Sequence, residues 1–537
     1  MGVSGPQLHA FQQNFKQNPY CACLHAVNHL DIGEALVTGP ALHQLMRSGE
    51  EQFDKHFADT FGQLSEQDLP QGMQAVAKAA LSNLLGGIGY FYGASLIQLP
   101  DRTVPSQEAG LFSAVPSRSF FPRGFLWDEG FHQLVISRWE PDMSRDMLAH
   151  WLDLMNQQGW IAREQILGAE ARSRVPEEFI VQRPDSANPP TLFLVLAQMA
   201  DQIAAAASDS SVSKALHDQE QFLQAAFARL AAWFTWFNTT QAGPLPGSYR
   251  WRGRDPNSLS ELNPKTLTSG LDDFPRASHP SVDERHVDLR CWMALAARAL
   301  TTIGTHLKLP KSQVQPFQQT AQLLEDVSGL KALHYDSRTG QFRDYGNHSE
   351  AMQLQPVVYQ TPQGLVRGPL QRRLVDPTQP PRLQLVPHFG YVSLFPLLMG
   401  LLDATSPELG QQLNLLQQPN LLWTPFGLRS LSKSSSMHGA YNTEHDAPYW
   451  RGPIWFNINY LALRALHRYS RLEGPHASVA HELHAQLRSN LLRNLVKGYT
   501  ESGYLWENYD DEDGHGKGSH PFTGWTALLV LVAGQTY

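Results

Sequence analysis

The chain has 537 residues, of which 42% are hydrophobic and 17% are charged, and its net charge is −8 with a pI near 6.3. This composition is typical of a globular protein, and at roughly 150 residues per domain the length allows three or four domains or one large barrel. The basic residues form no long run, so the sequence does not indicate a nucleic-acid-binding surface.

Several features bear on the compartment of the chain. No run of about 18 apolar residues occurs, so no membrane segment is predicted. The start, "MGVSGPQLHAFQQNF", lacks a charged region followed by an apolar one, and we expect no signal peptide. Cys21, Cys23 and Cys291 are too few for a disulfide framework, although a bridge to Cys291 stays open. Glycosylation sequons at Asn238 and Asn347 hint at a lumenal protein.

The pattern of apolar residues changes near residue 60. Residues 1–60 are polar and weakly periodic, and we expect a linker with one amphipathic helix around "EEQFDKHFADTF". Residues 61–537 contain twelve segments in which apolar residues recur at helical spacing. The predicted helices span residues 67–84, 127–138, 142–158, 190–206, 211–238, 283–307, 311–328, 391–402, 406–417, 453–469, 475–497 and 521–533.

The predicted helices are of two kinds. Segments such as "TLFLVLAQMADQIAAAA" and "GWTALLVLVAG" are apolar nearly all round, which indicates burial, whereas "HELHAQLRSNLLRNLVKGY" carries one apolar stripe. The two kinds alternate along much of the chain, as in an inner and an outer ring, and we predict an all-α (α/α)6 barrel. The competing α-solenoid needs a repeating sequence period, and we find none.

Strand signals are few and short in this sequence. The clearest are "LQLVPHFGYVSL" and "GLVRGPLQRRLV". The Pro- and Gln-rich stretch 353–386 contains the second of these and part of the first, and we interpret it as an insertion in a surface loop.

The informative residues lie between the predicted helices. Five long loops are dense in Trp, Tyr, Arg, Asp and Glu, and long loops of this composition tend to be functional. In a barrel of paired helices, the loops that enter the inner helices meet at one end, so we expect these five around one pocket. They read "FFPRGFLWDEGFHQL", "GSYRWRGRDPNSLSELNPKTLTSGLDDFPRASHP", "LWTPFGLRSLS", "HDAPYWRGPIWFNINY" and "GYLWENYDDEDGHGKGSHPFTGW".

Motifs for several kinds of chemistry are missing. The sequence contains no HExxH or CxxC, and the acidic run "YDDEDGHG" lacks the spacing of a calcium loop, so we predict no metal site. We interpret His132 and His286, which fall on apolar helical faces, as core or second-layer histidines. Because no GxSxG and no Gly-rich phosphate loop occurs, neither acyl transfer nor phosphoryl transfer is indicated, and we expect no cofactor.

Carboxylates flanked by aromatic residues remain, and they suit a carbohydrate. Sugar rings present apolar C–H faces and many hydroxyls, so their sites favour Trp and Tyr platforms with charged hydrogen-bonding groups. Glycoside hydrolysis needs one carboxyl group that donates a proton and a second that activates water or attacks the sugar. Asp272 and Asp273 are candidates for the donor, and Glu507 is the candidate for the second group. The loop tryptophans are Trp127, Trp251, Trp423, Trp450, Trp455, Trp506 and Trp525.

Five segments together carry a resemblance to a known family. They are "SFFPRGFLWDEGFHQL", "TSGLDDFPRA", "HVDLRCWM", "APYWRGPIWFNINY" and "GYLWENYD…HPFTGWTALLVL". The chain resembles glycoside hydrolase family 63 over roughly residues 60–537, and within that family the catalytic region of the eukaryotic processing α-glucosidases. A looser resemblance to the trehalases of family 37 rests on the W-D, S-G-x-D and E-x-Y-D landmarks in the same order.

The resemblance implies a fold, an activity and two catalytic groups. The family fold is an (α/α)6 barrel, and the implied activity removes the terminal α-1,2-linked glucose of the triglucosylated N-glycan precursor, with inversion. The family's general acid falls on Asp272 and its general base on Glu507, which leaves Asp273 as a neighbour that orients or tunes Asp272. Trehalose hydrolysis and glycan binding without catalysis are the alternatives.

The resemblance also implies binding residues and a location. The substrate would be a glucosylated high-mannose oligosaccharide on nascent glycoproteins in the endoplasmic reticulum lumen. Full-length family members resemble membrane-anchored proteins with a β-sandwich domain before the barrel, and we expect neither feature in this chain. Besides Asp273, the residues carried over to the sugar pocket are Arg123, Trp127, Asp128, Glu129, His132, Arg276, Tyr449, Trp450 and Arg451, with Trp455 and Trp525 as weaker candidates.

Overall fold

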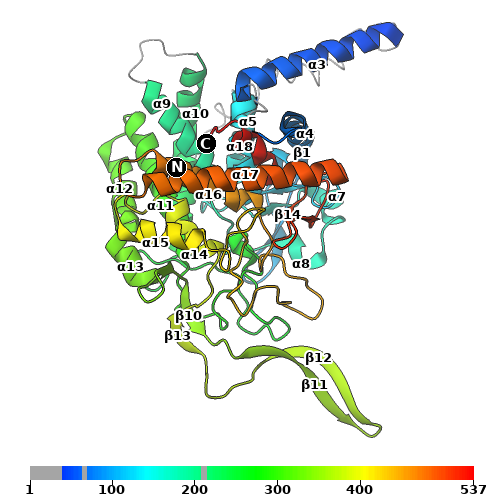
Figure 1. Cartoon of the computed structure of the whole chain (residues 1–537), viewed down its shortest axis with the longest axis vertical. Helices are drawn as coiled ribbons and strands as arrows, with labels where there is room; N and C mark the ends of the chain where they lie inside the picture. The colour runs from blue at the N-terminus through cyan, green and yellow to red at the C-terminus, as the bar shows by residue number, and fades with distance from the viewer. Residues whose placement is uncertain (1–38, 63, 65–68, 207–213) are drawn as a thin grey trace. The chain divides into compact units, whose positions relative to one another are not determined.

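The computed structural model describes residues 39–62, 64, 69–206 and 214–537 (Figure 1). The chain divides into two compact units, residues 1–63 and 64–537. The first unit contains helix α3 (Gly39–Phe61), which is longer than the helix predicted there. Across the described part of the chain, every helix is too short or too polar to span a bilayer. Cys21 and Cys23 lie outside the described residues.

Each of the twelve predicted helices has a counterpart in the second unit. The first residues of two predictions, 67–68 and 211–213, lie outside the described residues. The counterparts are α4 (Met73–Gly86), α5 (Leu126–Trp139), α6 (Pro141–Asp153), α9 (Leu192–Ala206), α10 (Lys214–Thr240), α11 (Val287–His306), α12 (Lys311–Glu325), α14 (Tyr391–Leu398), α15 (Pro407–Leu416), α16 (Phe456–Ser470), α17 (Ala477–Ser502) and the consecutive η4 (Trp525–Leu528) and α18 (Leu529–Ala533).

Six of these elements form a closed ring of neighbours. Helix α5 packs against α9, α9 against α11, and α11 against α14. The ring continues from α14 to α16 and from α16 to η4, and η4 returns to α5. These elements are buried on most sides: every residue of α14 is buried, and so is every residue of η4 and α18. The ring therefore forms the core of the second unit.

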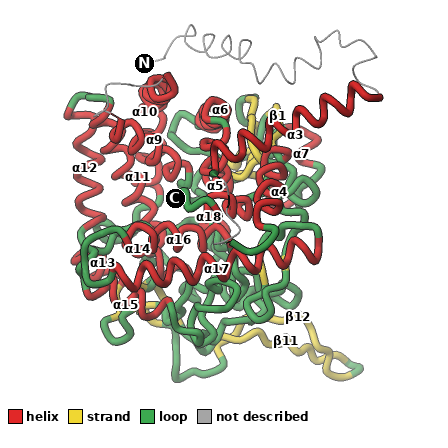
Figure 2. The backbone as a smooth tube through the Cα atoms, turned by 45° about the horizontal axis from the view of Figure 1, so that its top comes forward, coloured by secondary structure: helices red, strands yellow, loops and turns green. Residues whose placement is uncertain are grey.

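The other helices lie outside this ring, next to ring members that neighbour them in the chain. Helix α6 packs against α5, α10 against α9 and α11, α12 against α11, α15 against α14, and α17 against α16. Helix α4 contacts η4 and α18. In α12, the buried residues Val314, Phe317, Ala321 and Leu324 recur every three or four positions, which gives one stripe facing the ring. In Figure 2 many of the loops gather in the lower part of the view, below α16 and α17.

Three predicted helices end three or more residues early, at Asp153, Glu325 and Leu398, and the cause is visible for the first two. Helix α6 stops at Asp153 because the Asn156 side chain accepts the amides of Gln158 and Trp160 and turns the chain. The segment 311–328 is interrupted at Asp326, whose carboxylate accepts the amides of Ser328 and Gly329. This cap starts a separate helix, α13 (Val327–His334), which the sequence analysis missed. Two short helices in loops, α7 (Gly168–Arg172) and α8 (Glu177–Ile180), were also missed.

The strands form seven small sheets within the described residues. Most are pairs of two to six residues that fasten one loop to another. The pairs are β1 (Ile88–Gly93) with β4 (Ala109–Ala114), β5 (Gly124–Phe125) with β6 (Glu164–Gln165), β8 (Tyr335–Asp336) with β9 (Gln341–Phe342), β10 (Tyr345–His348) with β13 (Arg382–Leu385), β11 (Met352–Thr361) with β12 (Gly364–Leu374), and β14 (Asn508–Tyr509) with β15 (Gly516–Lys517); β2 (Leu96–Gln98) lies between β3 (Thr103–Pro105) and β7 (Val181–Gln182).

The stretch interpreted as a loop insertion is more ordered than predicted. Residues 352–374 form the antiparallel hairpin of β11 and β12, joined by the short turn after Thr361. Its Val, Tyr, Thr and Leu residues favour strands, and Pro362 and Gly364 favour the turn. The strand signal of β12 was identified from the sequence, but β11 was missed, because Pro356 argues against a strand there.

Candidate active site

A cavity of about 170 Å³ opens where the loops that enter the ring helices meet. Its walls come from the loop and first turn of α5, the loop before α9, the loops that precede α11 and α16, and the loop that leads into η4. The lining residues are Pro116, Phe121, Arg123, Phe125, Trp127, Asp128, Arg163, Glu164, Phe179, Asn188, Leu267, Gly270, Asp272, Tyr449, Trp450, Glu507, Phe522 and Trp525.

In the loop "TSGLDD", the side chains of Asp272 and Asp273 point in different directions. A short turn, η3 (Leu267–Ser269), ends at Gly270, whose φ is +75°. A Cβ there would lie 2.6 Å from the Trp127 ring, so both the backbone and the space require glycine. After this turn Asp272 lines the cavity, whereas Asp273 is buried and accepts the amides of Tyr449 (3.1 Å) and Trp450 (2.6 Å).

The pKa of the Asp272 carboxyl group lies above its ordinary value. Burial raises its pKa to about 7, and the nearby Asp273 and Glu164 carboxylates act in the same direction. Arg163 and Lys265 oppose this rise, because their positive charges favour the ionised form. The balance keeps Asp272 partly protonated near neutral pH, as a proton donor requires.

Glu507 is held rigidly on the cavity wall. One carboxylate oxygen accepts the Ser519 amide (2.9 Å) and hydroxyl (3.1 Å), and the other accepts the Tyr449 hydroxyl. Gly518 makes this geometry possible, since a Cβ at its φ of +76° would lie 2.5 Å from Glu507 Oε2. Burial raises the pKa of Glu507, and these hydrogen bonds lower it. The carboxylate is thus oriented and can still accept a proton.

A third carboxyl group, that of Asp128, shares the cavity. It lies in the first turn of α5, where the helix dipole favours a negative charge. Its side chain is buried, and both burial and the charge of Glu507 raise its pKa well above the usual value. Asp128 can therefore carry a proton beside Glu507 and donate or accept hydrogen bonds to a hydroxylated ligand.

Two arginines bracket a buried glutamate on another wall. Strands β5 and β6 pair and bring Arg123 against Glu164, with N–O distances of 2.9 and 2.7 Å. Arg163 donates to the other oxygen of Glu164 (2.7 Å) and to the Leu267 carbonyl (2.8 Å). Two positive charges thus face one negative charge close to Asp272.

Sequence reasoning missed Arg163 and Glu164, although a signal was present. They stand together inside the apolar stretch "WIAREQIL", where Ile161 and Ile166 are buried. Charged residues are rarely buried unless paired, so such an interruption indicates a buried ionic site. The missed phenylalanines at 121, 125, 179 and 522 and Asn188 carry no comparable signal.

Aromatic rings form the floor of the cavity. Trp127, Trp450 and Trp525 line it, with ring centroids of Trp127 lying 6.0 Å from Trp450 and 5.4 Å from Trp525. Trp455 stacks beneath Trp450 at 3.7 Å and is buried in the core. Trp251 is also buried, and its indole N–H donates to Asp288. Only part of the predicted tryptophan set therefore reaches the cavity.

Five residues predicted for the sugar pocket lie behind the lining. Glu129 is buried and accepts hydrogen bonds from Ser113 and Gln133, with His132 3.1 Å away. Asp273, Arg276 and Arg451 are also buried, and Arg451 donates to the Asp273 carbonyl at 2.7 Å. They flank lining residues in sequence, but their side chains hold the loops in place.

Arg276 is the centre of one such support. Its guanidinium donates to Asp288 at 2.6 Å and to Asp344 at 2.8 Å, and all three side chains are buried. Asp344 also accepts the amide of Val287, the first residue of α11. The network thereby ties the loop that carries Asp272 to the start of a ring helix.

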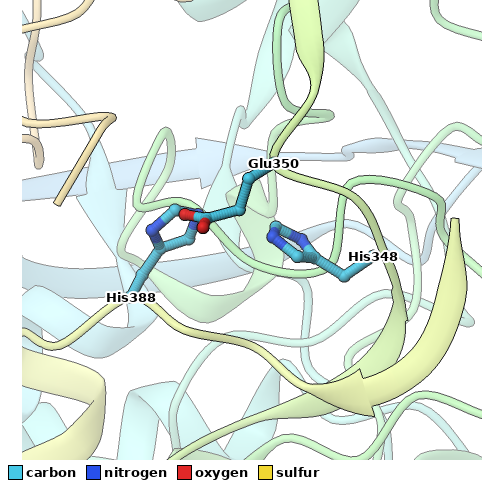
Figure 3. Close-up of side chains that lie close together, drawn as sticks. All are labelled: His348, Glu350 and His388. Carbon is cyan, nitrogen blue, oxygen red and sulfur yellow. The ribbon is translucent and has the colours of Figure 1, made fainter. Parts of the chain in front are cut away.

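One group of side chains has the spacing of a metal site (Figure 3). His348, Glu350 and His388 lie close together, with both imidazoles buried and the Glu350 carboxylate reaching toward them. The Ser278 amide donates to His348 Nδ1 (3.2 Å), so the proton of the neutral ring is on Nε2, its other nitrogen. A metal at Nε2 would require a ring without either proton or loss of this hydrogen bond. His348 therefore does not fit the role of a metal ligand.

The two sequon asparagines and Cys291 lie in helices or strands. Asn238 lies in α10, and its side chain accepts the Tyr249 hydroxyl at 2.6 Å. Asn347 lies in β10, half-buried, opposite Leu383 of β13. Cys291 is free and buried in α11, and burial raises the pKa of its thiol.

The chain is similar to known proteins over most of its length. The family model described as the glycosyl hydrolase family 63 C-terminal domain matches residues 37–535. A mannosyl-oligosaccharide glucosidase of Arabidopsis thaliana is 49% identical over 93% of this chain and 59% of its own length. The Saccharomyces cerevisiae mannosyl-oligosaccharide glucosidase is 35% identical over 90% of this chain and 60% of its own length. The chain thus spans about three fifths of these curated relatives.

Solved structures support the fold. The family 63 mannosylglycerate hydrolase of Thermus thermophilus, in complex with Tris, aligns over 86% of this chain and all of its own, with a TM-score of 0.54. Its sequence identity is 15%, so the likeness concerns the backbone arrangement alone.

Replacing Arg276 by Met should destabilise the second unit strongly. The change removes the only cation that donates to both Asp288 and Asp344 among the described residues, and it leaves two buried carboxylates uncompensated. Breaking a buried ion pair from one side typically costs about 3–5 kcal/mol. Urea denaturation followed by tryptophan fluorescence would measure the loss.

The matched control for this variant is Arg338→Met. Arg338 also pairs with an aspartate, Asp336, but 87% of its side chain is exposed. Asp336 is buried, but Arg343 remains 3.9 Å from it and water can reach it from the side of Arg338, so the control should lose much less stability than Arg276→Met. Equal losses in the two variants would contradict the support role assigned to Arg276.

Proposed function

The chain belongs to glycosyl hydrolase family 63, and from that premise we propose that it is an inverting exo-α-glucosidase. Its proposed substrate is the triglucosylated N-glycan precursor, from which it removes the terminal α-1,2-linked glucose in the endoplasmic reticulum lumen. The names of the Arabidopsis and yeast relatives support this substrate. The observation that carries the proposal is one cavity lined by Asp272, with a pKa near 7, and by the oriented carboxylate of Glu507.

The proposal includes the fold of the catalytic part. We assign residues 61–537 to an (α/α)6 barrel and residues 1–60 to a preceding segment. The closed ring α5–α9–α11–α14–α16–η4, with one amphipathic helix beside each member, supports this assignment. In such a barrel, the loops entering the inner helices share one end, which accounts for a site built from segments hundreds of residues apart.

In the proposed reaction Asp272 is the general acid. Its proton passes to the glycosidic oxygen as the bond from that oxygen to the anomeric carbon breaks. The released oligosaccharide then carries a hydroxyl group, and Asp272 is left ionised. The positive charge of Arg163 stabilises this ionised form, whereas burial favours the protonated form needed at the start.

Glu507 is the proposed general base. It takes a proton from a water molecule whose oxygen forms the new bond to the anomeric carbon on the face opposite the leaving group. This single displacement inverts the configuration, so the α-linked glucose leaves as β-glucose. The hydrogen bonds from Ser519 and Tyr449 fix the Glu507 carboxylate, so little reorganisation is needed as it accepts the proton.

The remaining lining residues suit a single sugar. Trp127, Trp450 and Trp525 offer apolar faces, and Asp128 and Arg123 offer groups for hydroxyls. The volume of about 170 Å³ is below the roughly 300–1,000 Å³ of pockets for drug-sized ligands. A site of this size supports removal of one terminal residue. Asp273, Glu129, His132, Arg276 and Arg451 are proposed as positioning residues.

The deciding experiment is glucose release from a triglucosylated high-mannose oligosaccharide by the whole chain. Asp272→Asn removes the proton donor and Glu507→Gln removes the base, so each should lower kcat by about 10²–10⁴-fold. Both substitutions are nearly isosteric, and thermal unfolding should change little. Glycan binding with no release by the wild type would favour a lectin-like protein, and cleavage of trehalose in place of the glycan would favour a trehalase.

A plot of kcat/KM against pH should have an alkaline limb and an acidic limb, with kcat/KM falling on each side of a maximum. The acid must be protonated, so kcat/KM should fall as pH rises above about 7, the pKa of Asp272. The base must be ionised, so kcat/KM should also fall as pH drops below the pKa of Glu507, which lies above its ordinary value of 4.5. Initial rates across the pH range measure both limbs.

Arg163 provides a sharper test of the alkaline limb. Its charge lowers the pKa of Asp272, so Arg163→Met should move that limb to higher pH, whatever happens to the maximal rate. Arg183→Met, at a largely exposed arginine, should leave the limb in place. An unmoved limb in the Arg163 variant would remove Asp272 from the role of acid.

The anomer of the product gives an independent test of the mechanism. Single displacement should release β-glucose first, with the α-anomer appearing later by mutarotation. Proton NMR of the anomeric signals during the first minutes of reaction distinguishes the two. Early α-glucose would indicate a double displacement and would assign Glu507 as a nucleophile.

A further inference from the structure

The β11–β12 hairpin projects from the second unit and pairs with no other strand among the described residues (Figures 1 and 2). Its ten-residue strand β11 is long enough to reach about 33 Å. The hairpin is fixed at its root, because the Arg372 guanidinium donates to the Ser278 carbonyl and the Arg372 amide donates to the Leu259 carbonyl at 2.6 Å. Ser278 follows Asp272 closely in the chain, so this root adjoins the catalytic loop.

The far end of the hairpin exposes apolar side chains on both of its faces. Tyr359 and Val366 are opposite each other in the ladder and share one face, with 51% and 49% of their surfaces exposed. Val358 and Leu365 belong to the other face and are 56% and 73% exposed. Exposed apolar side chains grouped at the end of a projecting element are available for contact with a partner outside this chain.

Every charged residue of the hairpin is an arginine. Residues 352–374 contain Arg367, Arg372 and Arg373 and no Asp, Glu, Lys or His, although the whole chain has a net charge of −8. Arg367 and Arg373 are exposed, and Arg367 pairs with Val358 directly behind the apolar cluster. Positive charge is thus placed next to exposed apolar surface.

We propose that the end of this hairpin binds the surface of a lipid bilayer that carries anionic headgroups. The side chains of Val358, Tyr359, Leu365 and Val366 enter the boundary between headgroups and acyl chains, and Arg367, beside them, contacts the phosphates. A fluid interface can surround both faces of a thin ribbon at once. A folded protein partner would have to wrap around the ribbon to cover the same residues.

Membrane binding by the hairpin end would also limit how far the hairpin root can lie from the bilayer. Because the root holds the segment after Asp272, a bound hairpin keeps that segment, at Ser278, within about 33 Å of the bilayer. Substrates attached to that bilayer surface would then be within reach. The inference does not require the proposed hydrolysis, since binding and hydrolysis are measured separately.

Vesicle flotation with the whole chain tests this inference. The wild type should float with phosphatidylcholine vesicles that contain about 30% phosphatidylserine, and less with phosphatidylcholine alone. Raising the salt to about 0.5 M should weaken the binding, because screening reduces the contribution of the arginines. Leu365→Ser with Val366→Ser should lower the affinity by about tenfold or more. Arg367→Glu, which reverses the charge next to the apolar cluster, should abolish the preference for phosphatidylserine.

The matched control is Leu323→Ser with Val479→Ser. These two aliphatic residues are 48% and 36% exposed on outer helices α12 and α17, so the chemical change is the same at another surface. The control should float as the wild type does, and all variants should keep the wild-type melting temperature. A wild type that stays unbound, or a hairpin variant that floats like the control, would overturn the inference.

Discussion

The hydrogen bonds that the backbone amides of Tyr449 and Trp450 donate to the Asp273 carboxylate are the constraint on which the site depends. They join two loops that are 176 and 177 residues apart in the chain. Asp272 is the covalent neighbour of Asp273, and Tyr449 donates to Glu507. The proposed acid and base are therefore connected by one short path of covalent and hydrogen bonds. Because these hydrogen bonds are directional and at least partly shielded from water, the path holds the two carboxyl groups in one geometry.

Electrostatics then separates the roles of carboxyl groups that share one cavity. Asp272 makes no side-chain hydrogen bond among the described residues, so burial dominates and its pKa rises to about 7. Glu507 accepts three hydrogen bonds, which favour its ionised form and oppose the effect of burial. The same chemical group thus becomes a donor at one position and an acceptor at another. Arg163 limits how far the pKa of Asp272 rises.

Local sequence rules explain where prediction succeeded and where it stopped. All twelve helices follow from the period of their apolar residues, because burying one stripe or one whole surface imposes that period. The break at Asp326 was missed, since a cap depends on one side chain and hardly alters the period. The strand signal of β12 was recognised, but β11 and its pairing with β12 were missed because Pro356 argues against a strand there. Arg276 and Arg451 were misplaced, since neighbours in sequence can face opposite sides of a loop.

The sequence by itself determined the helices, their alternation between buried and amphipathic types, and the two loops whose acids suit glycoside hydrolysis. These are local properties, and they can be read from residue type and spacing. Tertiary structure decided that the six buried elements close into a ring, that Arg163 and Glu164 stand beside Asp272, and that Asp273 faces away from the cavity. Such facts depend on contacts between distant segments, and a buried polar group finds its partner only when the fold brings both together.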